Sequence, residues 1–350
     1  MNLTKTRLLN QQLLTPQFTS PQELVSWMGM MQAQDYNMAK WAVGLRLETG
    51  NLSAVENALR KGDVIRIHVA RPTWHIVSKE DVRWMVALSS QRIKQVVNSY
   101  DRTLCFSEEE LSRFYRVLEK TLAGTDGLTR PEIKVRLAEL GFEITDNRVL
   151  THLMVCAETD AVVCSGIYKK HLSTYMLMDE RVPLTQVLTK DESLEKLARK
   201  YFQSHSPATL QDFCWWSGLT MADTKRAINI IDNELLIEKC DEQIFYIHSS
   251  CRIREGIIER MHLLPAFDEY LIAYKGRTMA LPTELYKHAF TNNGIFYQVV
   301  LKQGNVVGNW KKQIKKDTVQ VEYSWLDIAG NINQRQLSSA ENRLVEFLKP

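Results

Sequence analysis

The chain has 350 residues, a length that suits two to four small domains better than one. Hydrophobic residues make up 45% and charged residues 24% of it, which are ordinary values for a globular protein and argue against long disordered segments. No apolar stretch approaches the roughly 18 residues that a membrane helix requires, and the polar start Met1–Thr6 is not followed by a signal-type apolar core. Neither a membrane span nor export is expected, so the predicted location is the cytoplasm.

Cysteine spacing argues against the usual zinc and redox motifs. The six cysteines are scattered and no two have Cys-x-x-Cys spacing, so free thiols in a reducing compartment are the simplest interpretation. The sequence therefore predicts no metal site and no cofactor.

Charge alone does not decide whether the chain binds nucleic acid. The formal net charge is only +3, and what matters is whether basic residues share one face. Short basic clusters exist, and each is either a solvated surface or part of a DNA-contacting face. The candidate DNA contacts from these clusters are Lys169, Lys170, Lys225, Arg226 and Lys311.

Two helices and a β-hairpin are expected near the N-terminus. The helices begin with the capping sequences Ser20-Pro21-Gln22-Glu23 and Ser53-Ala54-Val55-Glu56, and the apolar face of the first extends to Met31. The runs Val64–Val69 and Thr73–Val77 have the composition of two strands. This order of elements is typical of a winged helix-turn-helix.

The same pattern returns twice along the chain. Its expected helix caps and strands are Thr129, Asp146 or Thr145, Ala161–Cys164 and Thr174–Met178 in the second copy, and Thr209, Thr220, Leu235–Lys239 and Ile244–His248 in the third. Winged helices also mediate protein contacts, so repetition by itself leaves open subdomains that bind no nucleic acid.

The sequence changes character after Met261. Three segments there alternate or run apolar like antiparallel strands, and a final helix follows: Ile295–Lys302, Asn305–Trp310, Thr318–Trp325 and Ser338–Leu348. The predicted fold class is α+β, with tandem winged-helix units and a C-terminal β-rich domain. The predicted units are residues 1–105, 106–190, 191–262 and 263–350.

Four segments in this order make the chain resemble the winged-helix DNA-binding proteins related to the bacterial AlkZ and YcaQ DNA glycosylases. They are Gly29-Met30-Met31-Gln32-Ala33-Gln34-Asp35, Arg71-Pro72-Thr73-Trp74-His75-Ile76-Val77, Ser206-Pro207-Ala208-Thr209 with Asp212 and Trp216-Ser217-Gly218-Leu219, and Leu264-Pro265-Ala266-Phe267-Asp268 with Arg277. The resemblance implies a C-shaped body of winged helices that hydrolyses the N-glycosidic bond of N-alkylated purines, including cross-linked ones, in duplex DNA.

The resemblance also implies which residues are catalytic. The family's signature is glutamine, an aliphatic residue and glutamine, which corresponds to Gln32-Ala33-Gln34, although alanine is a small occupant of the middle position. Side chains two apart on a regular helix point about 200° apart. We therefore expect Gln34 at a helix end or in a distorted turn, with a new helix beginning around Asp35.

Other residues of the matching segments have two interpretations each. Asp35 is a helix cap or a base, and Asp268 is a structural cap of the β-rich domain or lies near DNA. Arg71 and His75 are candidate DNA contacts, with a structural role as the alternative for His75.

Two classes of function remain open from the sequence. The first is a monofunctional DNA glycosylase for cationic alkylpurines, acting as a monomer on double-stranded DNA. The second is a non-catalytic winged-helix DNA-binding protein, such as a transcriptional regulator. A structural protein-interaction module is a third possibility, and the paired glutamines favour the enzyme.

Overall fold

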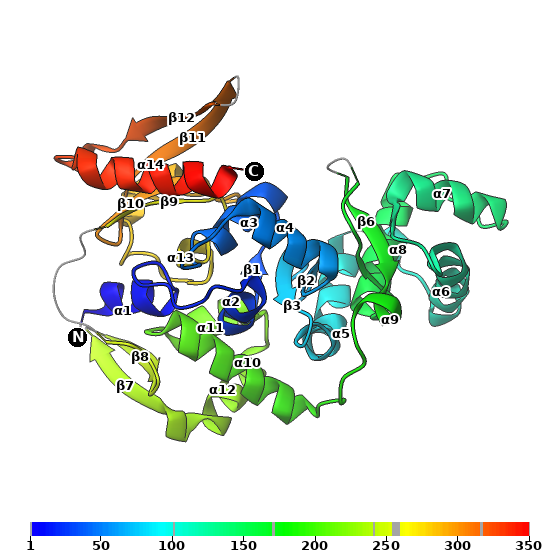
Figure 1. The fold of residues 1–350 in the computed structure, drawn as a ribbon. Coiled ribbons are helices and arrows are strands. Elements are labelled where there is room, and N and C mark those ends of the chain that lie inside the picture. Colours follow the sequence, from blue (N-terminus) through cyan, green and yellow to red (C-terminus); the bar gives the residue numbers. More distant parts are fainter. Residues whose placement is uncertain are drawn as a thin grey trace.

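The fold is a chain of helix–helix–hairpin units that ends in a β-rich domain (Figure 1). The computed structural model describes residues 2–100, 102–169, 172–240, 242–253, 260–315 and 318–349. In Figure 1 the β-rich domain lies at the upper left and helices α6–α8 of the second unit at the right, with α2–α5 of the first unit between them and the third unit below.

The first unit contains a three-stranded sheet in the order β1-β3-β2. Its elements are α1 (Leu3–Asn10), α2 (Pro21–Met28), β1 (Met31–Gln32), α3 (Tyr36–Gly44), α4 (Leu52–Lys61), β2 (Val64–His68), β3 (Trp74–Ser78) and α5 (Val82–Tyr100). Ser20 caps α2 with Pro21 in its first turn, as expected. The cap of α4 is Asn51, whose Oδ1 accepts from the Ala54 amide at 2.7 Å, so this helix begins before the expected cap at Ser53.

The second unit follows the expected order closely. Thr129 and Glu132 form a capping box at α7, and Asp146 caps α8. Its elements are α6 (Glu108–Leu122), β4 (Leu128–Thr129), α7 (Arg130–Glu139), α8 (Asn147–Thr159), β5 (Val163–Ser165), β6 (Thr174–Leu177) and α9 (Met178–Arg181).

The third unit contains a short helix, a tight glycine turn and a second helix. Thr209 and Asp212 form a capping box, Gly218 ends the first helix at a φ of 68°, and Thr220 caps the next. The elements are α10 (Lys190–His205), α11 (Leu210–Ser217), α12 (Met221–Ile230), β7 (Leu235–Cys240) and β8 (Gln243–His248).

The C-terminal domain is a four-stranded antiparallel sheet in the order β12-β11-β10-β9. Its elements are β9 (Met261–Leu264), α13 (Glu269–Ile272), β10 (Val299–Lys302), β11 (Asn305–Lys315), β12 (Thr318–Trp325) and α14 (Gln334–Leu348). Gln303 and Gly304 form the turn that joins β10 to β11, because Lys302 pairs with Asn305. The strand expected from Ile295 starts only at Val299.

Three hydrophobic clusters stabilise the molecule, and two of them cross the proposed unit boundaries. The first joins α2–α4 to β9–β12 and α14, and the second joins the opposite face of β2 and β3 to α5 and α10–α12. The buried residues of the third lie in the second unit, and Trp74 of the first unit packs against them. The first unit therefore packs against both the third unit and the C-terminal domain, and the division at residues 105, 190 and 262 stays a prediction.

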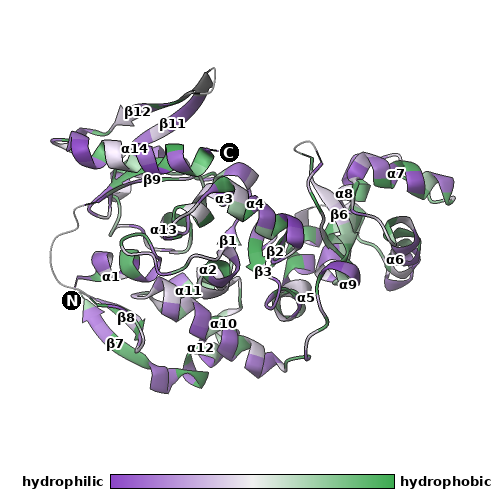
Figure 2. Cartoon of the chain, in the orientation of Figure 1, coloured by the Kyte–Doolittle hydropathy of each residue, from purple (hydrophilic) through white to green (hydrophobic). Residues whose placement is uncertain are grey.

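The hydropathy of the residues along the chain follows this packing (Figure 2). Strands β2 and β3 are mainly hydrophobic in the figure, whereas much of β11 is hydrophilic. Across the described ranges, no helix combines the length and the apolar character that crossing a bilayer requires.

Candidate functional site

Gln32 lies in the edge strand β1, and Gln34 lies in a bend directly before the N-cap of α3, so the expected position of Gln34 at a helix end, with a new helix around Asp35, is confirmed. Gly29 adopts a φ of 79° and ends α2 at Met28, before the apolar pattern itself ends. The chain then pairs with β3, with Gln32 opposite His75, and the Ala33 amide donates to the Trp74 carbonyl at 2.7 Å. Strand pairing therefore sets the direction of Gln32, whereas Gln34 follows the strand at the bend before α3.

The two glutamines have different surroundings. Gln32 is 5% exposed, and its Oε1 accepts a hydrogen bond from the Thr73 hydroxyl at 3.3 Å. Gln34 is exposed. Gln32 is thus part of the packed structure, while the Gln34 amide is presented to solvent.

Asp35 is a helix cap, as one of its two interpretations held. Its Oδ1 accepts from the backbone amides of Asn37 and Met38, both at 3.0 Å, and begins α3. The cap fixes the chain directly after Gln34.

A buried carboxylate holds the start of the segment. Glu269 is 1% exposed, and its carboxylate accepts a hydrogen bond from the backbone N–H of Gln32 at 2.6 Å. Its other oxygen accepts from the Trp216 indole at 3.2 Å and lies 3.6 Å from the His205 imidazole. Sequence reasoning missed Glu269, and the available signal was its position directly after Asp268 in a matching segment.

Asp268 anchors the same region from the neighbouring position. Its two carboxylate oxygens accept a bidentate pair of bonds from Arg46 at 2.7 and 2.8 Å, and both side chains are fully buried. Asp268 also caps α13 through the Tyr270 amide. The expected structural role of Asp268 is therefore confirmed.

His75 lies beside Gln32 and is buried. The two residues pair across the sheet, so their side chains share one face. The His75 Nδ1 donates to the Thr73 carbonyl at 3.0 Å, which leaves Nε2 as a buried acceptor without a partner. Burial, with Arg71 adding a smaller effect, holds the pKa of His75 well below its usual range. The imidazole is therefore neutral and does not lie at the surface, where DNA would contact it.

Arg66 holds the middle of the motif from the opposite face of the sheet. Its Nε donates to the Ala33 carbonyl and its Nη1 to the Tyr168 hydroxyl, both at 3.0 Å. The guanidinium lies 4.1 Å from the centre of the Trp74 ring. A charged residue inside the apolar run Val64–Val69 was the sequence signal for Arg66, and the sequence reading missed it.

A cavity of about 460 Å³ opens beside Arg66. One wall is the stacked pair Tyr36 and Tyr168, whose rings are 3.8 Å apart. Lys40 also lines it and pairs with Glu56 at 2.7 Å. The cavity starts two residues after Gln34 and has the size of a small-ligand site.

The predicted basic contacts do not gather into one cluster. Lys169 lies in the β5–β6 loop with its Nζ 3.7 Å from Glu132, and Lys311 is exposed on β11. Lys225 is exposed on α12, where Arg226 pairs with Asp191 at 2.5 Å. Lys170 lies outside the described residues. In Figure 1, β11 and β6 rise on either side of α3 and α4, whereas α12 lies on the opposite side of the molecule.

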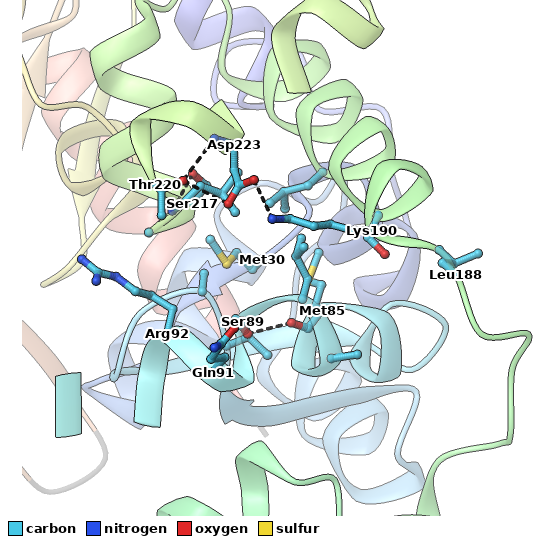
Figure 3. A pocket seen from close by; sticks show the side chains of 18 of the residues that line it. Met30, Met85, Ser89, Gln91, Arg92, Leu188, Lys190, Ser217, Thr220 and Asp223 are labelled. Carbon is cyan, nitrogen blue, oxygen red and sulfur yellow. Dashed lines mark hydrogen bonds and ion pairs between the residues drawn. The ribbon is translucent and has the colours of Figure 1, made fainter. Parts of the chain in front are cut away.

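Another cavity, of about 430 Å³, lies between α5, α10 and α12 (Figure 3). Met30 and Met85 contribute apolar lining, and Lys190 pairs with Asp223 at its edge. None of the candidate catalytic or DNA-contacting residues lines it, although Met30 and Ser217-Gly218-Leu219 belong to the matching segments. Within the described ranges, no three His, Cys, Asp or Glu side chains are grouped so as to hold a metal ion.

A family model decides the classification. The model for DNA glycosylase AlkZ-like proteins matches residues 25–347, which includes the glutamine segment and all four matching segments. The chain belongs to the AlkZ-like DNA glycosylase family. It is therefore a DNA glycosylase, a hydrolase that acts on DNA and belongs to DNA repair.

A solved structure agrees with this glycosylase in fold. The DNA glycosylase AlkZ of Streptomyces sahachiroi superposes with a TM-score of 0.80 at 18% identity, over 99% of this chain and 95% of that one. A search of curated proteins gave no match.

Proposed function

We propose that this glycosylase hydrolyses the N-glycosidic bond of cationic N-alkylated purines in duplex DNA, with Gln32 and Gln34 as its catalytic residues. N7-alkylguanine is the simplest such lesion, and cross-linked N7-alkylpurines belong to the same class. The observation that carries the proposal is the anchoring of the Gln32–Gln34 segment: Trp74, Arg66 and Glu269 each hold its backbone.

The chemistry needs little acid or base assistance. Alkylation at N7 gives the base a positive charge, and the electron pair of the breaking C1′–N9 bond neutralises that charge as the base leaves. Water then bonds to C1′ and releases a proton to solvent, so a neutral base and an abasic sugar result. The protein has to orient the water and stabilise the oxocarbenium-like sugar.

Amide side chains suit this task. A glutamine carbonyl accepts from water, and its NH₂ group donates to a phosphate or a base. Because an amide is not a base at neutral pH, neutral alkylated bases should be poor substrates. The exposed Gln34 is the amide that meets the substrate first. Gln32 is buried and held by the Thr73 hydroxyl, and it acts as the second amide of the site.

DNA is held by basic residues on both sides of α3 and α4. Lys311 on β11 and Lys169 in the β5–β6 loop are the proposed phosphate contacts on this side, and the protein acts as a monomer. Lys225 and Arg226 lie on α12, on the opposite side of the molecule in Figure 1. Lys225 and Arg226 are proposed to contact a part of the DNA away from the lesion.

Single-turnover excision from a duplex with one N7-methylguanine tests the proposal. Gln34→Ala should slow base release by about 10²–10³ with unchanged folding and DNA affinity, because an exposed amide fills no core space. Gln32→Ala should slow release and also lower thermal stability, because Gln32 is buried and bonded to Thr73. The apolar face of the first helix pattern ends at Met31, which predicted no core role for either glutamine, and the burial of Gln32 makes that prediction wrong for Gln32.

The outcomes separate the two classes of function. Wild-type protein that binds the lesion duplex but releases no base from any cationic alkylpurine would establish the non-catalytic DNA-binding alternative. Unchanged rates in both variants would show that the glutamines are not the catalytic residues. A double variant that loses less than the product of the two single losses would indicate that both amides act on one water.

A further inference from the structure

Trp215 on α11 is a partly exposed aromatic ring. It is 36% exposed, whereas Phe213 and Trp216 of the same helix are fully buried. Its indole nitrogen donates to the Ile272 carbonyl at 2.8 Å, so the ring is held in place. A fixed, exposed indole offers a stacking surface without a further ordering cost.

Three cations surround this ring. The charged groups of Lys275, Arg277 and Arg71 lie 4.8, 5.5 and 5.9 Å from its centre. They come from two separate segments, the β2–β3 connection and the loop after α13. The fold therefore brings like charges together that the sequence keeps about 200 residues apart.

None of the three cations has an acidic partner within 4.0 Å in the described parts of the chain. Nε and Nη2 of Arg71 and Nη2 of Arg277 are also buried without any hydrogen-bond partner there. Arg277 is only 8% exposed. The fully buried Arg46 shows the contrast, because it has the bidentate partner Asp268. The Nε and Nη1 of Arg277 donate to the Leu271 and Lys275 carbonyls, which supply no negative charge. A buried cation without an acidic partner is costly, so an anion bound here would stabilise the cluster.

Asp212 and Glu269 are the carboxylates that act electrostatically on Arg277 and Arg71, and both already accept other hydrogen bonds. Asp212 accepts from the amides of Lys275 and Gly276 through Oδ1 and from the Thr209 amide through Oδ2. Glu269 accepts from Gln32 and Trp216, as described above. Burial lowers the pKa of Arg277 to about 10, against smaller opposing effects of Tyr286 and Asp212 and with a still smaller lowering effect of Arg71.

We propose that Trp215, Arg71, Lys275 and Arg277 form a nucleotide-binding site, where a backbone phosphate of DNA binds the cations and the adjoining base or sugar packs on the indole. Guanidinium groups match the geometry of phosphate oxygens, and exposed aromatic rings accept bases of any sequence. Arg71 lies two residues before Thr73, which bonds Gln32. A DNA strand bound at this site would therefore lie close to the glutamine segment. The inference rests on the proposed function in this respect.

Lys275 offers the cleanest variant, because it is exposed and its removal should not affect folding. Lys275→Met should weaken binding to duplex DNA several-fold and reduce the slope of log affinity against log salt by about 0.9, the effect of one phosphate contact. Lys120→Met is the matched control, since Lys120 is exposed on α6 at the far end of the molecule. Its affinity and salt slope should equal those of the wild type.

A methylphosphonate scan around a single N7-methylguanine identifies the phosphate. At one position, a neutral linkage should lower the DNA affinity of the wild-type protein but not that of Lys275→Met. Separately, Trp215→Ala should bind DNA more weakly than the wild type, whereas Trp215→Phe should retain its affinity. Additive effects at every linkage, or an unchanged salt slope in Lys275→Met, would overturn the inference. Stabilisation by inorganic phosphate without any coupling to DNA linkages would also overturn it, because it would indicate an adventitious ion site.

Excision on the same preparations separates this inference from the proposed function. Wild-type protein that releases N7-methylguanine but shows no coupled linkage would refute the nucleotide-binding site alone. Coupled binding without any base release would refute the proposed catalytic activity and support the site.

Discussion

Asp268 and Arg46 illustrate how single residues stabilise the region behind the glutamines. The pair is fully buried, bidentate and shared with the cap of α13. Asp268→Asn leaves the Arg46 charge without its partner, so we expect a loss of about 3–5 kcal/mol of unfolding free energy. Asp63→Asn is the control, since its pair with Lys79 is part-exposed and should contribute about 1 kcal/mol or less. Urea denaturation of both variants measures the difference, and equal losses would contradict the assigned role.

His262 gives the stability of the protein a specific pH dependence. Burial lowers the pKa of this imidazole to about 3, and its Nε2 donates to the Leu13 carbonyl at 2.9 Å. In the unfolded chain the pKa is about 6.5, so the unfolded state binds the extra proton between pH 6.5 and 3. Stability should therefore be fully present above about pH 6.5 and fall as the pH decreases through this range.

Thermal unfolding between pH 8 and 4.5 tests this effect. His262→Gln keeps a donor for the Leu13 carbonyl and removes the titration, so its melting temperature should fall less steeply with acid than that of the wild type. His75 and His205 are also buried with lowered pKa values, so part of the acid sensitivity should remain. Parallel curves for the two proteins would show that His262 does not contribute.

At the scale of elements, the β11–β12 hairpin combines opposite charges on adjacent strands. Lys311 on β11 lies opposite Glu322 on β12 in the strand register. If the hairpin contacts DNA, Lys311→Met should weaken duplex binding several-fold, and Glu322→Gln should strengthen it, because it removes a negative charge beside the phosphate contact. Fluorescence anisotropy at two salt concentrations measures both changes. Effects of the same sign in the two variants would argue against a DNA contact at this hairpin.

At the scale of the whole molecule, the chemistry should need no metal ion. A cationic leaving group and amide side chains supply what the reaction requires, so base release should be unchanged after EDTA treatment. Single-turnover rates before and after chelation measure this directly. Activity that returns only on adding a divalent ion would point to a metal-assisted mechanism instead.

Local structure was largely predictable from the sequence. The caps at Ser20, Thr129, Asp146 and Thr209 work through hydrogen bonds within three residues, so their sequence signals are complete in themselves. The repeated helix–helix–hairpin order and the long strand β12 were predictable for the same reason, since propensity and alternation act locally.

The arrangement around the glutamines was decided by tertiary contacts. The apolar pattern of α2 continues to Met31 and suits a helix, but pairing with β3 and the bond to Glu269, 237 positions away, hold Met31 and Gln32 in a strand. Neither contact has a local signature. The burial of Gln32 and the positions of Arg66 and Trp215 follow from the same long-range packing, which determines whether each side chain faces the core, a cavity or solvent. The sequence by itself thus determined the family, the helix caps and the identity of the candidate amides, because these depend on residue type and short spacing. Which of those side chains are exposed, and which cations lie together without partners, was decided only by the tertiary structure, because burial and charge proximity depend on segments distant in sequence.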